Sequence, residues 1–305
     1  MDNRRVLFTA QKDEGRYVLE WSAYHKIIGF TDFIFCSNDC TDGSYDLLNA
    51  LQELGHCQHF IHHPKDLTPQ HNAAKLAYDN GLFTDGDWVM WMDLDEYLFV
   101  NISDHKLDNL IHAIEGRNMI YVAWKLFGDN GNKTWPGRHV TDKLITCEAF
   151  DENVEPAGKS LFKWSNKISD FSAHRPWVKS GVTREEFDAI SSAGTRPTPF
   201  FGVKRGQKFH RLLNGGQYWK LAQVNHYAVR TPDAYIEKSE RGAGNPSRSK
   251  VRNKYKNAYY RKYNRNEAVD RKILVFRDQI DAEVSLLKEQ LASLNSVKIE
   301  KFLAK

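Results

Sequence analysis

The sequence predicts an α/β protein with a doubly wound sheet and a C-terminal helical extension. Two observations support this prediction: short apolar segments alternate with amphipathic ones through residue 124, and polar clusters follow several of the apolar segments. Alternating strands and helices are typical of sheets built from parallel strands. In such sheets, ligands bind beyond the carboxyl ends of the strands, where these polar clusters are expected to lie. With 305 residues, 41% of them apolar, the chain is long enough to bury a large core.

The elements follow from the spacing of apolar residues and from the positions of turn formers. Residues 88–92 are apolar throughout, as in a central strand buried on both faces. The strands are expected at residues 6–9, 32–36, 60–61, 88–92 and 120–124, and the helices at residues 17–28, 45–54, 70–78 and 107–114.

A long amphipathic helix is expected over residues 268–294. Its apolar stripe either packs on the rest of the protein or forms the seam of a homodimer, and the spacing leaves both roles open. The stripe consists of Ile273, Phe276, Ile280, Val284, Leu287, Leu291 and Leu294.

Charge and cysteine content indicate where the protein acts. The net charge is only +4, but residues 241–277 are rich in Lys and Arg, which suggests a surface for phosphates, an anionic membrane or an acidic polymer. The spacing of the four cysteines matches no zinc motif and favours reduced thiols in a cytosolic protein. No apolar run approaches the roughly 20 residues that span a bilayer. We therefore expect a cytoplasmic protein, with peripheral contact at the inner membrane face as the role of the basic stretch.

The end of the fourth strand carries the clearest chemical signal. Asp93 and Asp95 are two residues apart, so in an extended segment both point to the same side. Two neighbouring carboxylates repel each other, and Mg²⁺ or Mn²⁺ would relieve that repulsion while sharing its coordination shell with phosphates. The simpler alternative is that the acids cap the following turn. Glu14, which follows the first strand, has the same two roles open, since an acid also stabilises the first turn of a helix.

Several ordered segments resemble a group of glycosyltransferases related to families 2 and 92. The opening residues 12–21 (KDEGRYVLEW) and 23–30 (AYHKIIGF) resemble its "KNExxYLLEWxAYHxxLGF" pattern. The resemblance covers roughly residues 4–245. The other segments are residues 38–44 (NDCTDGS, like "DNxSTDGS"), 88–98 (WVMWMDLDEYL, like "WvaxiDxDEFl"), 124–131 (like "WxxFGxxG"), and 225–227 (NHY), 235–239 (YIEKS) and 241–242 (RG), like "NHYxxKSxexFxxKxxRG".

This resemblance implies a GT-A-type mixed sheet, with a catalytic domain over residues 1–230 and a basic helical extension over residues 231–305. It implies a nucleotide-diphosphate sugar donor, with a UDP-sugar favoured, and a glycan or glycolipid acceptor. Mn²⁺ or Mg²⁺ would be held by Asp93, Asp95 and His226. One departure is Ser37, which stands where family 2 enzymes carry the Asp that reads the nucleotide base. The donor-binding residues would be Lys12, Glu14, Asn38, Asp39, Asp93, Lys238 and Arg241.

The resemblance also makes inversion the expected stereochemistry, because family 2 relatives invert. An inverting reaction needs a carboxylate as general base for the acceptor hydroxyl. Asp129 is favoured for this role because it lies in a Gly-rich loop. The other candidate bases are Glu148 and Asp170, and the candidates for stacking on sugar rings are Trp124, Trp135 and Trp177.

Two other function classes compete with a transferase. A metal-dependent phosphohydrolase would use Asp93 as nucleophile and Asp95 as acid, but such enzymes place Thr or Val where Tyr97 stands. A nucleic-acid binder would use residues 248–277, where basic side chains alternate with aromatic ones. The same segment also suits docking of a helix on the catalytic domain, and we expect no nucleic-acid partner. Its aromatic residues are Tyr255, Tyr259, Tyr260 and Tyr263.

Overall fold

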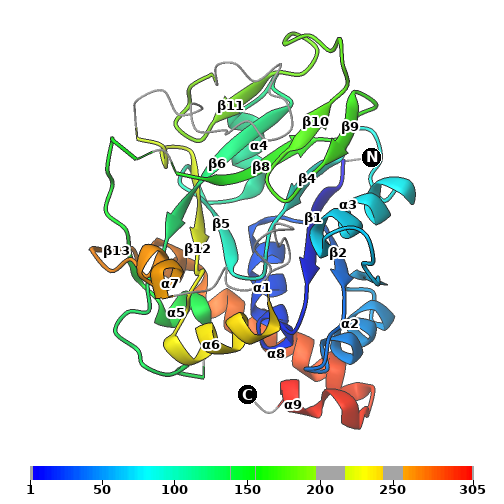
Figure 1. The fold of residues 1–305 in the computed structure, drawn as a ribbon, viewed down its shortest axis with the longest axis vertical. Coiled ribbons are helices and arrows are strands. Elements are labelled where there is room, and N and C mark those ends of the chain that lie inside the picture. Colours follow the sequence, from blue (N-terminus) through cyan, green and yellow to red (C-terminus); the bar gives the residue numbers. More distant parts are fainter. Residues whose placement is uncertain (1–2, 138, 155, 197–216, 243–256, 304–305) are drawn as a thin grey trace.

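A computed structural model describes residues 3–137, 139–154, 156–196, 217–242 and 257–303 (Figure 1). The described part is a mixed α/β structure in which helices pack on a large central sheet, as the sequence predicts. Residues 243–256, which include part of the basic stretch and Tyr255, lie outside the described residues.

The central sheet has nine strands within the described ranges, in the order β3-β2-β1-β4-β8-β6-β12-β5, with β11 paired to β6. Two short ribbons, β9–β10 and β7–β13, lie outside this sheet. The strands are β1 (Arg5–Gln11), β2 (Asp32–Ser37), β3 (Gln58–Ile61), β4 (Trp88–Trp91), β5 (Glu96–Val100), β6 (Met119–Leu126), β7 (Thr146–Cys147), β8 (Gly158–Lys163), β9 (Ile168–Phe171), β10 (Pro176–Val178), β11 (Ala189–Ser191), β12 (Ala222–His226) and β13 (Ala268–Val269).

The sheet changes character at β4. Strands β3, β2, β1 and β4 are parallel, whereas β8 runs antiparallel between β4 and β6. Strand β12 is parallel to β6 and antiparallel to β5. Gly158 permits the close contact of β8 with β6, because a methyl group on its α-carbon would lie 2.1 Å from the carbonyl oxygen of Val122. The half of the sheet formed by β8, β6, β12 and β5 therefore contains both parallel and antiparallel pairs.

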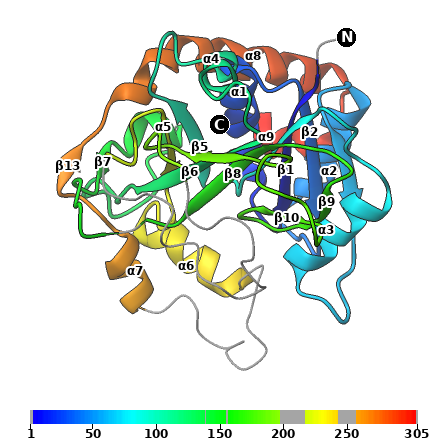
Figure 2. The same ribbon diagram turned by 90° about the horizontal axis from the view of Figure 1, so that it is seen from above.

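Helices cover both faces of the sheet. Figure 2 shows α1 and α8 on one side, and α3 with the β9–β10 hairpin on the other. The helices are α1 (Gly15–Ile28), α2 (Ser44–Glu53), α3 (Pro69–Asp79), α4 (Leu107–Ala113), α5 (Val140–Lys143), α6 (Pro232–Arg241), α7 (Asn257–Tyr263), α8 (Arg277–Ser293) and α9 (Glu300–Leu303), with the 3₁₀ helices η1 (Lys272–Phe276) and η2 (Val297–Ile299).

Two apolar cores lie on the two faces, as the alternation of side chains along β1 requires. Leu7 belongs to the larger cluster, under α1, α2 and α8. Its neighbours Val6 and Phe8 belong to the second cluster, under α3 and β9. Strand β4 contributes to both clusters and is buried at every position, which confirms that it is a central strand.

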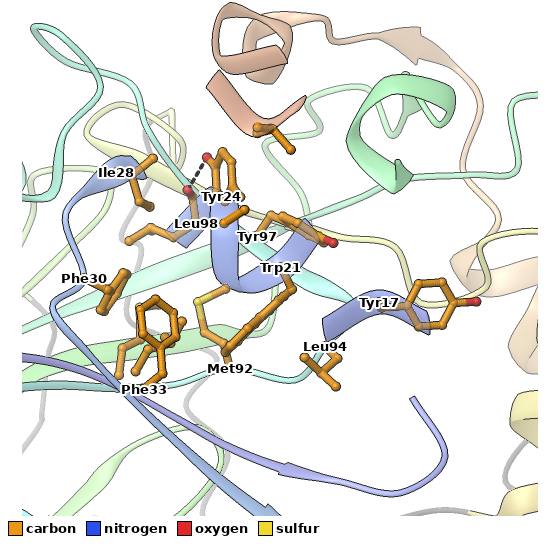
Figure 3. Close-up of a cluster of buried hydrophobic side chains, with 14 of the residues drawn as sticks. Tyr17, Trp21, Tyr24, Ile28, Phe30, Phe33, Met92, Leu94, Tyr97 and Leu98 are labelled. Carbon is orange, nitrogen blue, oxygen red and sulfur yellow. Dashed lines mark hydrogen bonds between the residues drawn. The ribbon is translucent and has the colours of Figure 1, made fainter. Parts of the chain in front are cut away.

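Helix α1 is joined to β5 by hydrogen bonds as well as by apolar packing (Figure 3). The indole nitrogen of Trp21 donates to the carbonyl oxygen of Glu96 at 2.9 Å, and the Tyr24 hydroxyl donates to that of Leu98 at 2.6 Å. The backbone nitrogen of Leu98 lies 3.4 Å from Nε2 of His25. Burial lowers the pKa of His25 to about 3, so the imidazole is neutral and Nε2 can accept this bond. The backbone of β5 is thereby fixed against α1.

The expected helix over residues 268–294 begins later than predicted, at Arg277. Ala268 and Val269 pair with β7 instead, and the Asp270 carboxylate accepts hydrogen bonds from Lys125 and Gln223. These contacts hold the segment extended before the 3₁₀ turn η1. Most of the predicted stripe is nevertheless confirmed in its burial, since Leu294 is partly buried and the other six residues are buried in the larger cluster: Ile273, Phe276, Ile280, Val284, Leu287 and Leu291.

Helix α8 packs directly on α1, with an ion pair of 2.6 Å between Lys26 and Glu283 at the edge of the contact. Packing is therefore one role of the stripe, while a homodimer seam and a domain boundary at residue 230 stay predictions. Within the described ranges, no helix is both long and apolar enough to cross a membrane.

Two neighbouring leucines of α8 test how strongly this helix stabilises the fold. Leu287 is 3% exposed and Leu286 is 44% exposed. We expect Leu287→Ala to lower the free energy of unfolding by about 2–5 kcal/mol because it leaves a cavity in the core. Leu286→Ala should change it by less than about 0.5 kcal/mol. Urea unfolding of both variants measures the difference, and equal losses would contradict the burial described for α8.

Candidate active site

The carboxyl ends of β1, β2 and β4 meet at one edge of the sheet because the three strands are parallel. Residues 93–96, which we call the acidic turn, connect β4 to β5 at this edge. Strand β12 ends there too, since His226 pairs with Glu96. The edge therefore collects nearly all of the predicted site: Lys12 and Glu14 after β1, Asn38 and Asp39 after β2, Asp93 and Asp95 in the acidic turn, and His226 at the end of β12.

A fully buried lysine holds the acidic turn from β8. The ammonium group of Lys159 lies 3.2 Å from Oδ2 of Asp93 and 2.9 Å from Oε2 of Glu96. Burial opposes its charge, but the two carboxyl groups outweigh this effect and raise the pKa of Lys159. Burial also raises the pKa of Glu96, whose Oε2 accepts a hydrogen bond from the backbone nitrogen of Asp93. Lys159 thus stays charged and offsets the negative charge of the acidic turn.

A second lysine, from α6, holds Asp95. The Lys238 ammonium group lies 2.5 Å from Oδ2 of Asp95 and 2.8 Å from the carbonyl oxygen of Ala228. Burial disfavours a charged Asp95, yet the charges of Lys238 and Arg230 hold its pKa well below the usual range. The predicted donor-binding residue Lys238 is therefore engaged with Asp95.

His226 lies beside Asp95, with Nε2 3.8 Å from Oδ1 of Asp95. Burial lowers the pKa of His226 to about 3, so its imidazole is neutral. Its Nδ1, and Oδ1 of Asp93, are buried atoms without a hydrogen-bond partner among the described residues. The structure therefore brings the three predicted metal ligands to one place and leaves oxygen and nitrogen atoms there unsatisfied.

Glu14 is bound by two arginines rather than left open to the edge. Its carboxylate lies 3.3 Å from Arg230 and 2.9 Å from Arg241. Arg241 also donates to the carbonyl oxygens of Lys12 and Asp13. Both the predicted residues Glu14 and Arg241 thus fasten α6 to the loop after β1.

The loops after β1 and β2 are tied together. Oδ1 of Asp13 accepts hydrogen bonds from the backbone nitrogens of Thr41 and Asp42, at 2.6 and 3.1 Å. The Asn38 side chain donates to Asp39, whose own side chain is exposed at the edge. These two loops form one unit that presents Asn38 and Asp39 together.

The predicted base Asp129 is held within its own loop. Its carboxylate accepts hydrogen bonds from Tyr260, Asn264 and the backbone nitrogen of Gly131. Its catalytic role stays a prediction, but these contacts also give it a clear structural role. Asp170 lies on β9 and lines a groove of about 340 Å³ between β9 and α3.

Glu148 differs from these two carboxylates. It is buried, and its Oε1 accepts a hydrogen bond from the backbone nitrogen of Leu126, which pairs with His226 in the neighbouring strand. Burial raises the pKa of Glu148 to about 7. A carboxyl group with this pKa is suited to accept a proton near neutral pH.

Of the three candidate stacking tryptophans, Trp124 adjoins the site. Its ring centroid lies 4.3 Å from that of His226. Trp135 instead packs edge-on against Tyr17, and Trp177 lies under the guanidinium of Arg175, which is 3.9 Å from the ring centroid.

Two site residues were not predicted from the sequence, Lys159 and Arg230. Arg230 is buried and donates to the carbonyl oxygen of Leu94 in the acidic turn. A signal existed for Lys159, since it is a charged residue between Gly158 and a run of small or apolar residues, 160–162. A buried lysine is rare without an acidic partner, and the acidic turn was the obvious candidate.

The described part of the basic stretch packs on the protein. Tyr259 and Tyr263 of α7 stack with ring centroids 4.2 Å apart, Tyr259 also stacks on Tyr235 of α6, and Tyr263 lies 5.9 Å from the His226 ring. These contacts match the helix-docking alternative for the aromatic residues of this segment.

Comparison with known proteins identifies the family. The sequence profile of glycosyltransferase family 92 matches residues 9–189, more than half of the chain. The chain belongs to glycosyltransferase family 92. Membership confirms the expected enzyme class, a glycosyltransferase, and together with the mixed sheet it confirms the GT-A-type α/β fold class. No curated protein sequence matches the chain.

Several solved structures show weaker likenesses. S. aureus TarS is 13% identical, over 52% of this chain and 28% of that chain, with a TM-score of 0.34. TarS 1-349 in complex with UDP-GlcNAc is 13% identical, over 43% of this chain and 37% of that one, with a TM-score of 0.29. HddC from Yersinia pseudotuberculosis is 9% identical, over 76% of this chain and 97% of that one, with a TM-score of 0.35. The chain thus spans less than half the length of the TarS chains it matches.

Two lysines of β8 test the buried charge of the site. Lys159→Met leaves Asp93 and Glu96 without their cation, and we expect it to lower the free energy of unfolding by about 3–5 kcal/mol. Lys163→Met on the same strand removes a half-buried lysine that has no acidic partner among the described residues, and should change it by less than about 1 kcal/mol.

Glu96→Gln should recover much of the loss when it is combined with Lys159→Met, because it removes one of the carboxyl groups left unpaired. Chemical denaturation of the four proteins of this cycle measures the coupling. Additive losses would show that Lys159 and Glu96 do not stabilise each other.

Proposed function

We propose that this chain transfers a sugar from a nucleotide-diphosphate sugar to a hydroxyl group of a glycan or glycolipid acceptor, with a divalent cation and with inversion. UDP-sugars are the first donors to test. The observation that carries the proposal is the acidic turn at the carboxyl edge of the sheet, in a member of a glycosyltransferase family. Asp93 and Asp95 each have one oxygen engaged by a lysine and another that no lysine of the described residues contacts.

Unsatisfied atoms of the site support a role for Mn²⁺ or Mg²⁺. Oδ1 of Asp93 lacks a partner among the described residues, and neutral His226 stands beside Oδ1 of Asp95. No three His, Cys, Asp or Glu side chains in the described ranges are arranged to hold a metal alone. We therefore propose that Asp93, Asp95 and His226 supply part of the shell and donor phosphates the rest, as is common for these ions. When bound, the cation would offset charge on the departing nucleoside diphosphate.

Fixed cations of the chain support the same step. Lys238 and Arg241 stand on α6 at the edge where the acidic turn and the loop after β1 meet. Their hydrogen bonds to Asp95 and Glu14 hold them in place before a donor arrives. Preorganised positive groups stabilise developing negative charge without reorganisation, which suits the leaving diphosphate.

For the general base we propose Glu148 in preference to Asp129. Glu148 is buried next to the strand pair that ends in His226, and its pKa near 7 suits proton transfer. The Asp129 carboxylate is instead held within its own loop by hydrogen bonds from Tyr260, Asn264, Asn266 and the backbone nitrogen of Gly131.

The first experiment is a donor screen. Purified protein is incubated with UDP- and GDP-sugars, with Mn²⁺ or with EDTA, and released nucleoside diphosphate is measured. We expect release with one donor in Mn²⁺, and a loss of roughly 10²–10³-fold in Asp95→Asn, the scale of one lost electrostatic contact to developing charge. Asp278→Asn, an exposed acid at the start of α8, is the matched control.

Other outcomes of the screen are equally clear. Full activity in EDTA would contradict metal dependence and assign the charge compensation to Lys159 and Lys238. Phosphate release from p-nitrophenyl phosphate, without any transfer, would support the phosphohydrolase alternative instead.

A pH profile tests the base. Glu148 accepts a proton only when it is ionised, so kcat/KM should rise tenfold per pH unit below about 7 and level off above it. Glu148→Gln should lose about 10²–10⁴-fold and flatten this limb. If Asp129→Asn flattens the limb and Glu148→Gln does not, the base is Asp129.

A further inference from the structure

The last described residues pack against the start of α1. A methyl group on the α-carbon of Gly15 would lie 2.8 Å from Cε1 and 2.9 Å from Cζ of Phe302. Gly15 does not have the positive φ that would itself require glycine. The space that a side chain at residue 15 needs is therefore filled mainly by the Phe302 ring, with Oδ2 of Asp42 at 3.1 Å.

The same segment reaches the start of α2. A methyl group on Gly43 would lie 2.5 Å from Nζ of Lys301 and 3.6 Å from Cε2 of Phe302. The Phe302 ring thus spans the first residues of two helices, and Lys301 lies beside it, with its Nζ 5.3 Å from the ring centroid.

Neighbouring contacts hold this segment in place. Ile299 is 1% exposed and belongs to the larger apolar cluster, and Phe302 and Leu303 pack against that cluster. Lys298 forms an ion pair of 3.5 Å with Asp46 on α2. Helix α9 contacts α8, as Figure 1 shows, and η2 contacts α2, in agreement with this ion pair.

Phe302 contacts the starts of α1 and α2, which follow directly on the loops after β1 and β2. The backbone nitrogen of Gly15 donates to Oδ2 of Asp42 at 2.8 Å, and Asp13 accepts hydrogen bonds from the backbone of residues 41 and 42. The loops after β1 and β2 are thus cross-linked, and the Phe302 ring covers the junction. The residues on these loops that the sequence predicts to bind the donor are Lys12, Glu14, Asn38 and Asp39.

We propose that Phe302 is a positioning residue for the nucleotide end of the donor site, a role that rests on the proposed function. By filling the space between Gly15 and Gly43, the ring holds the two loops in the arrangement that receives the nucleotide. Without the ring the loops gain conformational freedom. Part of the donor's binding free energy is then used to order them, so donor affinity falls. Phe302 touches no reacting group, so it acts on donor affinity and leaves the chemical step unchanged.

Kinetics and nucleotide binding test this role. Phe302→Ala should raise the donor KM and the Kd of UDP or GDP, whichever the wild type binds, about tenfold, which corresponds to about 1.4 kcal/mol. The value of kcat should stay within about twofold, because the interaction is absent from the chemical step. Phe302→Tyr should retain the wild-type values, and Val297→Ala, at a 77% exposed position of η2, is the matched control.

Gly15→Ala supplies an independent check. The added methyl group must displace the Phe302 ring, so the single variant should show the same rise in KM. The double variant Gly15→Ala/Phe302→Ala should be no weaker than either single one, since both remove the same contact. Losses that multiply would overturn the proposal.

Hydrogen exchange separates this proposal from the proposed function. In the protein without donor, the amides of residues 13–16 and 41–44 should exchange faster in Phe302→Ala than in wild type and Val297→Ala. If these amides exchange faster in Phe302→Ala but the protein binds no nucleotide, then Phe302 does order the two loops and the proposed donor site is wrong. Unchanged exchange, an unchanged KM, or a lower KM in Phe302→Ala would overturn the positioning role.

Discussion

The acidic turn at the carboxyl edge of the sheet depends on one buried cation, the ammonium group of Lys159. Three acidic residues lie within four positions of the acidic turn, and their mutual repulsion would open the turn if it were not compensated. Lys159 contacts Asp93 and Glu96 from β8, while Lys238 contacts Asp95 from α6. Strand β8 runs antiparallel between β4 and β6, and this insertion is what brings Lys159 under the turn. The mixed topology of the sheet and the charge of the site are therefore linked.

Much of the segment 12–30, which resembles the opening of the glycosyltransferase pattern, supports the fold rather than the chemistry. The indole of Trp21 and the hydroxyl of Tyr24 bind the backbone of β5, and the Glu20 carboxylate accepts hydrogen bonds from the backbone of Val140 and Thr141. Side chains on α1 thus position the strand after the acidic turn and the start of α5. A sequence pattern found next to a site can record what holds the site in place as well as what acts in it.

The parallel half of the sheet and its polar edge could be predicted because each strand there is a local apolar run followed by a helix. Strands β5, β8 and β12 were not predicted, since their pairing joins segments far apart in the chain, and the short sequences of β8 and β12 are also mixed in polarity. Lys159 and Arg230 were missed for the same reason, because their partners are distant in sequence. The sequence predicts a helix at residues 268–270, but the Asp270 side chain accepts hydrogen bonds from Lys125 and Gln223. Such tertiary contacts override local helix propensity.

The packing of α8 on α1 also affects how the protein is made. Helix α1 leaves the ribosome long before the side chains that cover its outer face, among them Val284 and Leu291, are synthesised. At roughly 5–20 residues per second, the apolar face of α1 waits for tens of seconds before its partner emerges. During that interval the nascent chain displays a hydrophobic surface that chaperones can bind. Yield in a heterologous host should therefore depend on translation speed and chaperone supply as much as on the stability of the finished fold.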